Sequence, residues 1–262
     1  MSAQLDDYWR QQKIIITAAA SGIGADVMAA YLARGAKAYF CDVDAAKVEE
    51  MCRKHPGLQG QVADVSDPDQ VDAFIDAGVK ALGGLTILIN NAGIAGPAGP
   101  VESISTEDWN RTFAVNVAGQ FYCVRRAVAA LKANGGGSIV NMASVAGKFG
   151  FPLRSPYSTS KWAVIGFTRG LSIELGPHKI RVNAILPGVV EGDRIKRVFT
   201  DRAASKGISY DEMQRQALAS ASLGSMVTHE EIADLILYVT SPSGRNITGQ
   251  PLSICGGMEW LV

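Results

Sequence analysis

The chain has 262 residues, of which 47% are hydrophobic and 19% charged, so it can bury a sizeable core and global disorder is excluded. Its 25 basic residues balance 25 acidic ones without a long run of either sign, so the sequence lacks the charge pattern that binds nucleic acid or an anionic membrane. The four cysteines and three histidines form no zinc spacing, so we expect no metal and reduced thiols in a cytoplasmic protein, and no apolar run approaches the ~18 residues that span a bilayer.

Short apolar runs alternate with longer helical patterns along the chain. Several runs, such as "LTILIN", are apolar throughout, which is typical of parallel strands covered by helices on both faces. This alternation predicts one doubly wound, Rossmann-type α/β domain over residues 1–262. The expected strands are Lys13–Ala18, Lys37–Asp42, Leu58–Ala63, Leu85–Asn90, Ser138–Ala143, Arg181–Leu186 and Pro251–Cys255.

Capping signals mark several helix boundaries. Asp67 followed by Pro68 predicts a helix start, and Thr228 with Glu231 three residues later forms a possible capping box. Thr106 begins a long helical segment that ends before three glycines at 135–137. Residues 191–225 break the strand–helix rhythm, and we interpret them as a substrate lid; a solvated helical excursion is the alternative.

A glycine-containing turn, "TAAASGIG", connects the first strand to a helix. Gly22 and Gly24 would let the backbone approach a pyrophosphate at the helix N-terminus. Ala18 is a small change from glycine if its φ is negative and a costly one if its φ is positive. The two glycines alone are equally compatible with an ordinary turn.

Asp42 indicates what this turn binds. It ends the second strand, 18 residues after Gly24, where a carboxylate would accept hydrogen bonds from the adenosine ribose and repel a 2′-phosphate. The sequence therefore predicts NAD as the cofactor; a capping role for Asp42 in the next turn is the alternative. Asp64 and Val65, after the third strand, could meet the adenine ring, although Asp64 is equally a turn residue.

Four polar residues form a candidate catalytic group. Tyr157 and Lys161 in "YSTSK" lie four apart in a helical segment and share one face. The nearby ammonium would stabilise a phenolate, so Tyr157 could take the hydroxyl proton of an alcohol while the alcohol carbon gives hydride to the cofactor. Ser144, at the end of the fifth strand, could bond the substrate oxygen. Asn116 interrupts the long helix and could hold water at a kink, or simply bond a neighbouring carbonyl.

These motifs resemble the short-chain dehydrogenase/reductase family in order and spacing, from about Lys13 to the C-terminus. The resemblance implies a seven-stranded parallel sheet with helices on both faces and a catalytic tetrad of Asn116, Ser144, Tyr157 and Lys161. It implies that Lys161 binds the nicotinamide ribose and joins a water relay held by Asn116. It also implies a homotetramer with the last strand and C-terminal tail in one interface. The motifs are "TAAASGIG", Asp42, "NNAG" at 90–93, Asn116, Ser144, "YSTSK" and "PG" at 187–188.

The resemblance also assigns the cofactor contacts. The turn Asn91–Gly93 would lie against the cofactor, and the backbone after Pro187–Gly188 would meet the nicotinamide carboxamide. Gly192 departs from the family, which often has a threonine there that touches the carboxamide and pyrophosphate. The residues expected to bind the cofactor are Ser21, Gly22, Ile23, Gly24, Asp42, Val43, Asp64, Val65, Asn91, Ala92, Gly93, Tyr157, Lys161, Pro187, Gly188 and Val190.

The predicted function is an NAD-dependent dehydrogenase of a small-molecule secondary alcohol of the sugar, sugar-acid, polyol or hydroxy-acid type. Two alternatives stay open: an NAD(P)H-dependent carbonyl or 3-oxoacyl reductase, and a catalytically silent nucleotide sensor. Ser144 and Tyr157 would contact the substrate. Arg154 and Arg194 would bind an anionic substrate, unless these cations are simply solvated.

Overall fold

The computed structural model describes residues 7–261 and contains one seven-stranded sheet with the strand order β3-β2-β1-β4-β5-β6-β7. Every neighbouring pair is parallel, as expected for a Rossmann-type fold. The seven predicted strands are confirmed, each within two residues of its expected bounds. They are β1 (Lys13–Thr17), β2 (Lys37–Asp42), β3 (Gln59–Val62), β4 (Ile87–Asn90), β5 (Gly137–Met142), β6 (Ile180–Pro187) and β7 (Pro251–Ile254).

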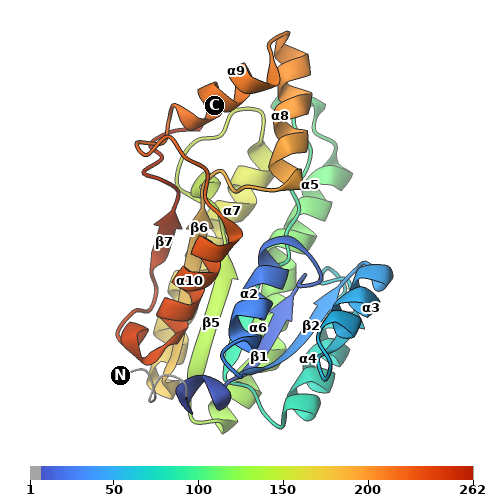
Figure 1. Cartoon of the computed structure of the whole chain (residues 1–262), viewed down its shortest axis with the longest axis vertical. Coiled ribbons are helices and arrows are strands. Elements are labelled where there is room, and N and C mark those ends of the chain that lie inside the picture. The colour runs from blue at the N-terminus through green and yellow to red at the C-terminus, as the bar shows by residue number, and fades with distance from the viewer. Residues whose placement is uncertain (1–6, 262) are drawn as a thin grey trace.

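Helices connect the strands and cover both faces of the sheet (Figure 1). Three predicted start signals are confirmed by cap hydrogen bonds, at Asp67, at Ser105 just before Thr106, and at the Thr228–Glu231 capping box. The helices are α2 (Gly22–Leu32), α3 (Ala45–Lys54), α4 (Pro68–Leu82), α5 (Thr106–Phe113), α6 (Gly119–Ala133), α7 (Ser155–Leu175), α8 (Asp193–Lys206), α9 (Tyr210–Leu218) and α10 (His229–Thr240). Shorter helical segments lie between these elements: η1 (Val101–Ser103), η2 (Ala114–Ala118), η3 (Val145–Gly147), η4 (Gly176–His178) and η5 (Pro242–Gly244).

The central strands feed two separate cores because successive side chains point to opposite faces of a sheet. Ile14 and Ile16 of β1 are buried with α2, α3 and α10 on one face. Ile15, between them, is buried with α4, α6 and α7 on the other. This is why the strands read as continuous apolar runs rather than as alternating ones.

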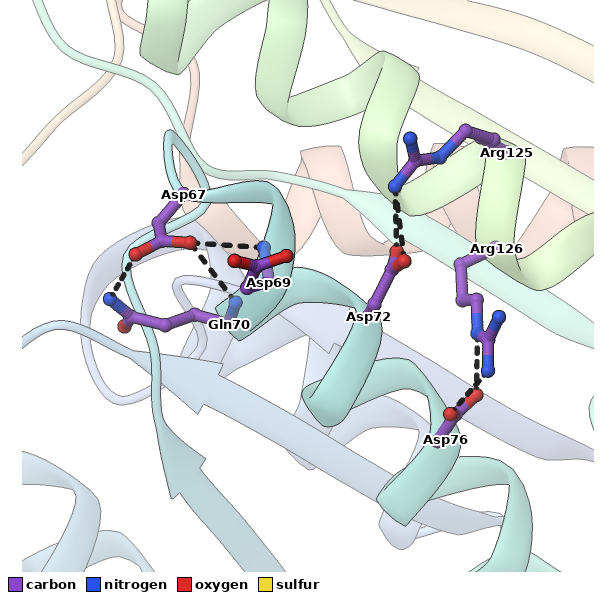
Figure 2. Close-up of polar contacts among 7 residues, drawn as sticks. All are labelled: Asp67, Asp69, Gln70, Asp72, Asp76, Arg125 and Arg126. Atoms are coloured by element: carbon purple, nitrogen blue, oxygen red, sulfur yellow. Dashed lines mark hydrogen bonds and ion pairs between the residues drawn. The ribbon is translucent and has the colours of Figure 1, made fainter.

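Two ion pairs link α4 to α6 at the surface (Figure 2). Arg125 donates to both carboxylate oxygens of Asp72, at 2.9 and 3.1 Å. The Nε of Arg126 donates to Asp76 at 2.7 Å, and its Nη2 bonds the second oxygen. The Arg126 guanidinium holds the pKa of Asp76 below its usual range. Because these side chains are largely exposed, each pair contributes at most ~1 kcal/mol.

The segment predicted as a lid forms α8 and α9, which lie beyond the carboxyl ends of the strands (Figure 1). These two helices have a small core of their own around Phe199 and Met213. The segment is anchored at its base, because Glu191 donates its backbone N–H to Val227 and Val227 donates to Val189. Ligands of open α/β sheets bind at this edge, so the segment is placed where a lid would act.

Candidate active site

The turn between β1 and α2 contains a left-handed alanine. Ala18 has φ 51°, so the costly of the two alternatives for this alanine is the one observed. Gly22, which begins α2, has φ 58°, a conformation that glycine adopts without strain. The first of these positions therefore carries a conformational cost that the family's usual glycine would avoid.

Asn91 and Gly24 hold this turn in place. Asn91 Nδ2 donates to the carbonyl oxygens of Ala18 at 2.9 Å and Thr17 at 3.1 Å. A Cβ on Gly24 would lie 2.4 Å from the Ala18 oxygen and 2.5 Å from Asn91 Nδ2, so glycine is required there for close approach. Asn91, a predicted cofactor contact, therefore holds the turn between β1 and α2 in place.

Asp42 fixes the same loop from the end of β2. Its Oδ2 accepts the backbone N–H of Ala20 at 3.2 Å, and its Oδ1 accepts that of Asp44 at 3.3 Å. The second bond is the capping role weighed for Asp42 above, and it coexists with the first. The neighbouring Val43 is exposed. The carboxylate is therefore oriented by backbone donors beside the turn.

Asp64, just after β3, bonds within the turn that follows this strand. Asp64 accepts hydrogen bonds from the amide and hydroxyl of Ser66 and pairs with Arg111 at 2.9 Å. Burial opposes ionisation of Asp64, but these bonds outweigh it and hold its pKa below the usual range. The buried Val65 side chain packs at the position of Gly119, where a Cβ would lie 2.9 Å from it. The Asp64 carboxylate therefore stabilises the turn after β3, in the turn role that the sequence left open for it.

Helix α2 offers free donors where a phosphate would bind. Ser21 precedes it in extended conformation and forms no side-chain cap, unlike Asp44, Asp67 and Ser105, which cap α3, α4 and α5. Uncapped N-terminal amides and the helix dipole favour an anion. Together with the close approach at Gly24, these residues fit a dinucleotide diphosphate.

Tyr157 and Lys161 lie one turn apart on α7. Lys161 is buried, and its Nζ lies 5.6 Å from the centre of the Tyr157 ring and donates to the Met142 carbonyl at 2.9 Å. The Met142 carbonyl ends β5, so it ties the lysine to the carboxyl edge of the sheet. The predicted helix-face pair is confirmed in geometry.

Asn116 lies in a π-helical turn, η2, between α5 and α6. The predicted interruption of the long helix is therefore confirmed. Its Nδ2 donates to Ile94 O and Ser160 Oγ, both at 3.0 Å, and its Oδ1 accepts Ile94 N–H at 2.8 Å. Asn116 Oδ1 and Lys161 Nζ each lie 3.3 Å from the place of a Cβ on Gly93. Gly93 thus lets the asparagine and lysine converge.

Ser144 follows the end of β5 and lies at the same carboxyl edge of the sheet. It is buried, and its Oγ accepts the Ala146 N–H at 3.2 Å. A hydroxyl that accepts can still donate. The following turn, η3, is fixed to α7 because Ser158 donates to Ala146 O at 2.7 Å and a Cβ on Gly147 would lie 2.6 Å from Lys161 O. Ser144 is thereby held beside the first turns of α7.

Two supporting residues were not predicted. Ser160 accepts from Asn116 and donates to Tyr157 O at 2.7 Å. Gln120 donates from Nε2 to Met142 O at 3.3 Å, the same carbonyl that holds Lys161. The available signal was spacing, since Gln120 follows Asn116 by four residues and shares its helix face.

Of the two arginines predicted to bind substrate, the structure describes the side chain of Arg154 but not that of Arg194. Arg154 Nη2 donates to Ala95 O at 2.8 Å, and its guanidinium lies 5.5 Å from the centre of the Tyr157 ring. Arg154 therefore braces the loop after Gly93. The backbone of Arg194 lies in α8, and its side chain is outside the described part of the structure.

Strand β6 ends at Pro187, and Gly188 follows it beside β7. Gly188 donates to Ile254 O at 2.9 Å, and a Cβ on it would lie 2.8 Å from Cys255. Val190 forms a bridge to Val227. Ile23 is partly buried in α2, and Ala92 donates to Thr17 Oγ1 at 3.0 Å. The backbone predicted to meet the carboxamide is thus held at the carboxyl edge.

Neither a metal cluster nor a membrane span is found between residues 7 and 261. Within that range, His, Cys, Asp and Glu side chains nowhere gather in groups of three or more that could hold a metal ion. The helices in the same range are too short or too polar to cross a bilayer.

Comparisons with known proteins find relatives that match most of this chain. The family model described as enoyl-(acyl carrier protein) reductase matches residues 17–259. The "Monensin polyketide synthase putative ketoacyl reductase" of Streptomyces virginiae is 36% identical over 251 residues, which cover 93% of this chain and 95% of that protein. A crystal structure of NAD+-bound xylitol dehydrogenase superposes with a TM-score of 0.89 at 26% identity, over 94% of this chain and 98% of that one. A crystal structure of an actinorhodin polyketide ketoreductase variant with NADPH gives 0.89 at 29% identity, over 95% and 97%.

Proposed function

The chain belongs to the short-chain dehydrogenase/reductase family of oxidoreductases, and from this premise we propose that it is an NAD-dependent dehydrogenase of a secondary alcohol, with Tyr157 as general base. The observation that carries the proposal is the convergence of Asn116 and Lys161 at Gly93, one helical turn from Tyr157. A protein that only sensed nucleotides would have no use for a tyrosine one turn from a buried lysine and a hydrogen-bonded asparagine.

The proposed reaction moves one hydride and one proton. When bound, the nicotinamide supplies the acceptor for the hydride that leaves the alcohol carbon. Tyr157 Oη takes the hydroxyl proton, and the carbon–oxygen bond becomes a carbonyl. Ser144 Oγ donates to the substrate oxygen and orients it. The positive charge of Lys161 stabilises the phenolate form of Tyr157.

Lys161 and Asn116 would move the proton onward. Lys161 is fixed by the Met142 carbonyl, and Asn116 by both polar groups of Ile94 and by Ser160. Groups held this firmly keep their orientation during the reaction, which lowers the cost of reorganisation. We assign them binding of the nicotinamide ribose and support of a water relay.

Asp42 supports NAD over NADP. Its two oxygens are held by the amides of Ala20 and Asp44, which place a negative charge beside the loop. A 2′-phosphate at the adenosine ribose would be repelled by that charge. Solved relatives include one with NAD+ and one with NADPH, so the choice in this chain rests on its own residue.

Steady-state kinetics with both cofactors test the cofactor assignment. We expect a higher kcat/KM with NAD than with NADP for the unmodified protein. Asp42→Asn keeps an acceptor oxygen for Ala20 but removes the charge, so the NAD-to-NADP ratio should fall at least ~10-fold, equivalent to ~1.4 kcal/mol. Preference for NADP in the unmodified protein would overturn this assignment.

A reductase of acyl-thioester ketones is the second candidate. It is favoured by the similarity to a ketoacyl reductase and to a polyketide ketoreductase, whereas the xylitol dehydrogenase neighbour favours polyols. Absorbance assays distinguish the two when NAD is offered with polyols, sugars, sugar acids and hydroxy acids, and NADPH with 3-oxoacyl thioesters. Turnover confined to the second arm would replace our proposal.

A homotetramer is also proposed, from the surface of α6 and α7. Phe121 on α6 and Trp162 and Ile173 on α7 are large apolar side chains that are 46%, 53% and 80% exposed. Gly166 and Gly170 on α7 have open space where a Cβ would lie, so a partner helix could approach closely. We propose that these exposed side chains lie in a subunit interface. Light scattering during size-exclusion chromatography should give four times the 27.7 kDa chain mass, and Trp162→Glu should lower it.

The cysteines support a cytoplasmic setting for this proposed enzyme. All four are free thiols, and burial raises the pKa of Cys41 to about 12, so it is protonated and unreactive. Thiols of this kind persist in a reducing compartment.

A further inference from the structure

The imidazole of His229 lies where three segments meet at the carboxyl edge of the sheet. Helices α2 and α10 pack side by side (Figure 1). They run in the same direction, because His229 at the start of α10 bonds Asp26 in α2, while Thr240 at the end of α10 bonds Tyr31 near the end of α2. Both helix N-termini therefore face the edge where ligands of this fold bind.

The two ring nitrogens of His229 face different partners. Nδ1 lies 2.7 Å from Asp26 Oδ2. Nε2 lies 3.5 Å from the place where residue 192 would carry a Cβ, immediately before α8. Residue 192 is glycine with φ 127° and ψ 178°, a conformation that disfavours a side chain. Glycine at position 192 therefore places no side chain against Nε2 at the base of the proposed lid.

A dinucleotide diphosphate would pass through this place. In Rossmann-type folds the diphosphate lies at the N-terminus of the helix after the first strand, here α2. Asp26 lies one turn inside that helix, and Gly192 follows the end of β6, across from it. A ring that is anchored on Asp26 and reaches Gly192 would lie beside a diphosphate bound at this helix N-terminus.

We propose that His229 is a cofactor-binding residue whose imidazolium, held through Nδ1–H by Asp26, donates Nε2–H to the diphosphate of the bound dinucleotide. The proposal rests on the function proposed above, since it takes the dinucleotide as given. Only the imidazolium has N–H groups on both nitrogens, so it alone can bond an anion on each side. The ring would thus be a cation between a carboxylate and a diphosphate.

Carboxylates outnumber cations around the ring. On the three segments around the ring, Asp26 is the one charged residue of α2, and the exposed carboxylates of Glu191, Asp193, Glu230 and Glu231 surround the starts of α8 and α10. Lys196 of α8 pairs with Asp193, and the Arg194 side chain is outside the described part of the structure. The start of α10 does not depend on His229, because Thr228 and Glu231 cap it with bonds of 2.8 and 3.1 Å.

His229→Gln tests the proposal by direct binding, without turnover. Isothermal titration with ADP-ribose and with NADH should show affinities about tenfold weaker than in the unmodified protein, because both ligands contain the diphosphate. Adenosine, measured by displacement of NADH fluorescence, should bind as before. His178→Gln is the matched control, since His178 is exposed in η4 at the opposite edge of the sheet; its affinities should be unchanged.

Proton uptake gives a readout that a merely structural role would not move. Titration of ADP-ribose at pH 8 in buffers of different ionisation enthalpy should show proton uptake on binding, because donation to both Asp26 and the diphosphate requires a proton on each ring nitrogen. His229→Gln should abolish this uptake and Asp26→Asn should reduce it. Unchanged ADP-ribose affinity in His229→Gln would overturn the proposal, as would a loss confined to NADH, which places the ring at the nicotinamide. An equal loss for adenosine would also overturn it, because it indicates local unfolding. Failure of the proposed function would appear instead as absent alcohol oxidation while ADP-ribose still binds.

Discussion

Replacing Ala18 with glycine measures the conformational cost built into the phosphate loop. Ala18 has φ 51°, where an alanine costs ~1–2 kcal/mol relative to the right-handed form. Glycine avoids that cost but gives the unfolded chain more freedom, which destabilises by ~0.4–1 kcal/mol. The net expectation for Ala18→Gly is a stability gain of ~0.5–1 kcal/mol, or roughly 1–4 °C in Tm for a chain of this size.

The same change should leave cofactor affinity nearly unaltered. The contacts that force the alanine into this shape are internal, from Asn91 Nδ2 to Ala18 O and from the close approach of Gly24. Free and bound protein therefore carry the same cost, and it cancels in Kd. We expect less than a ~10-fold change in NADH affinity by fluorescence titration.

Gly22→Ala is the matched control. Gly22 has φ 58° and open space where its Cβ would lie, so alanine there introduces the conformational cost without a clash. Its Tm should fall by about as much as that of Ala18→Gly rises. A Tm for Ala18→Gly at or below that of the parent protein would refute the reasoning. So would an affinity gain above tenfold, which would show that the loop rearranges on binding.

Two further changes test the surroundings of the site and the packing of the helices. Arg154→Ala should lower kcat/KM by similar factors for neutral and anionic alcohols. The reason is that Arg154 donates to Ala95 O and lies over the Tyr157 ring, so its loss would disturb the site whatever the charge of the substrate. A KM raised only for anionic alcohols would show that Arg154 binds the substrate instead. Asp76→Asn should cost at most ~1 kcal/mol of unfolding free energy at pH 7. Because Arg126 lowers the folded pKa of Asp76, this contribution is present above the unfolded value near ~3.9 and is lost as pH falls through the folded value. Urea titrations at pH 7 and pH 2.5 should therefore show a smaller difference between parent and variant at the lower pH, and an unchanged difference would contradict the assignment.

Much of the fold could be predicted because strands that are buried on both faces appear in the sequence as unbroken apolar runs. Ile14, Ile15 and Ile16 are consecutive apolar residues that serve two cores, which requires helices above and below the sheet. The capping box at Thr228 was readable for a similar reason, since its two bonds lie within four consecutive residues. Local chemistry of this kind is visible in sequence.

Long-range contacts in the site were harder to predict from the sequence. The φ of Ala18 is set by Asn91, which lies 73 residues away, so the sequence could only state both alternatives. Arg111 reaches Asp64 across 47 residues, so the ion pair that braces this turn could not be predicted from the local sequence. Gln120 bonds the Met142 carbonyl across 22 residues and Ser160 bonds Asn116 across 44, so spacing could suggest the helix face of Gln120 but not these partners.

The most direct test of the proposed dehydrogenase is Tyr157→Phe, which removes the phenolic oxygen that is proposed to take the substrate proton. Reduced nicotinamide would be followed by absorbance while NAD and the best alcohol of the panel are supplied, and NADH binding would be measured in parallel. We predict that Tyr157→Phe lowers kcat at least ~100-fold, as expected for loss of a general base, while NADH affinity stays within threefold of the parent value. Turnover close to that of the parent protein would contradict the assignment of Tyr157 as the general base.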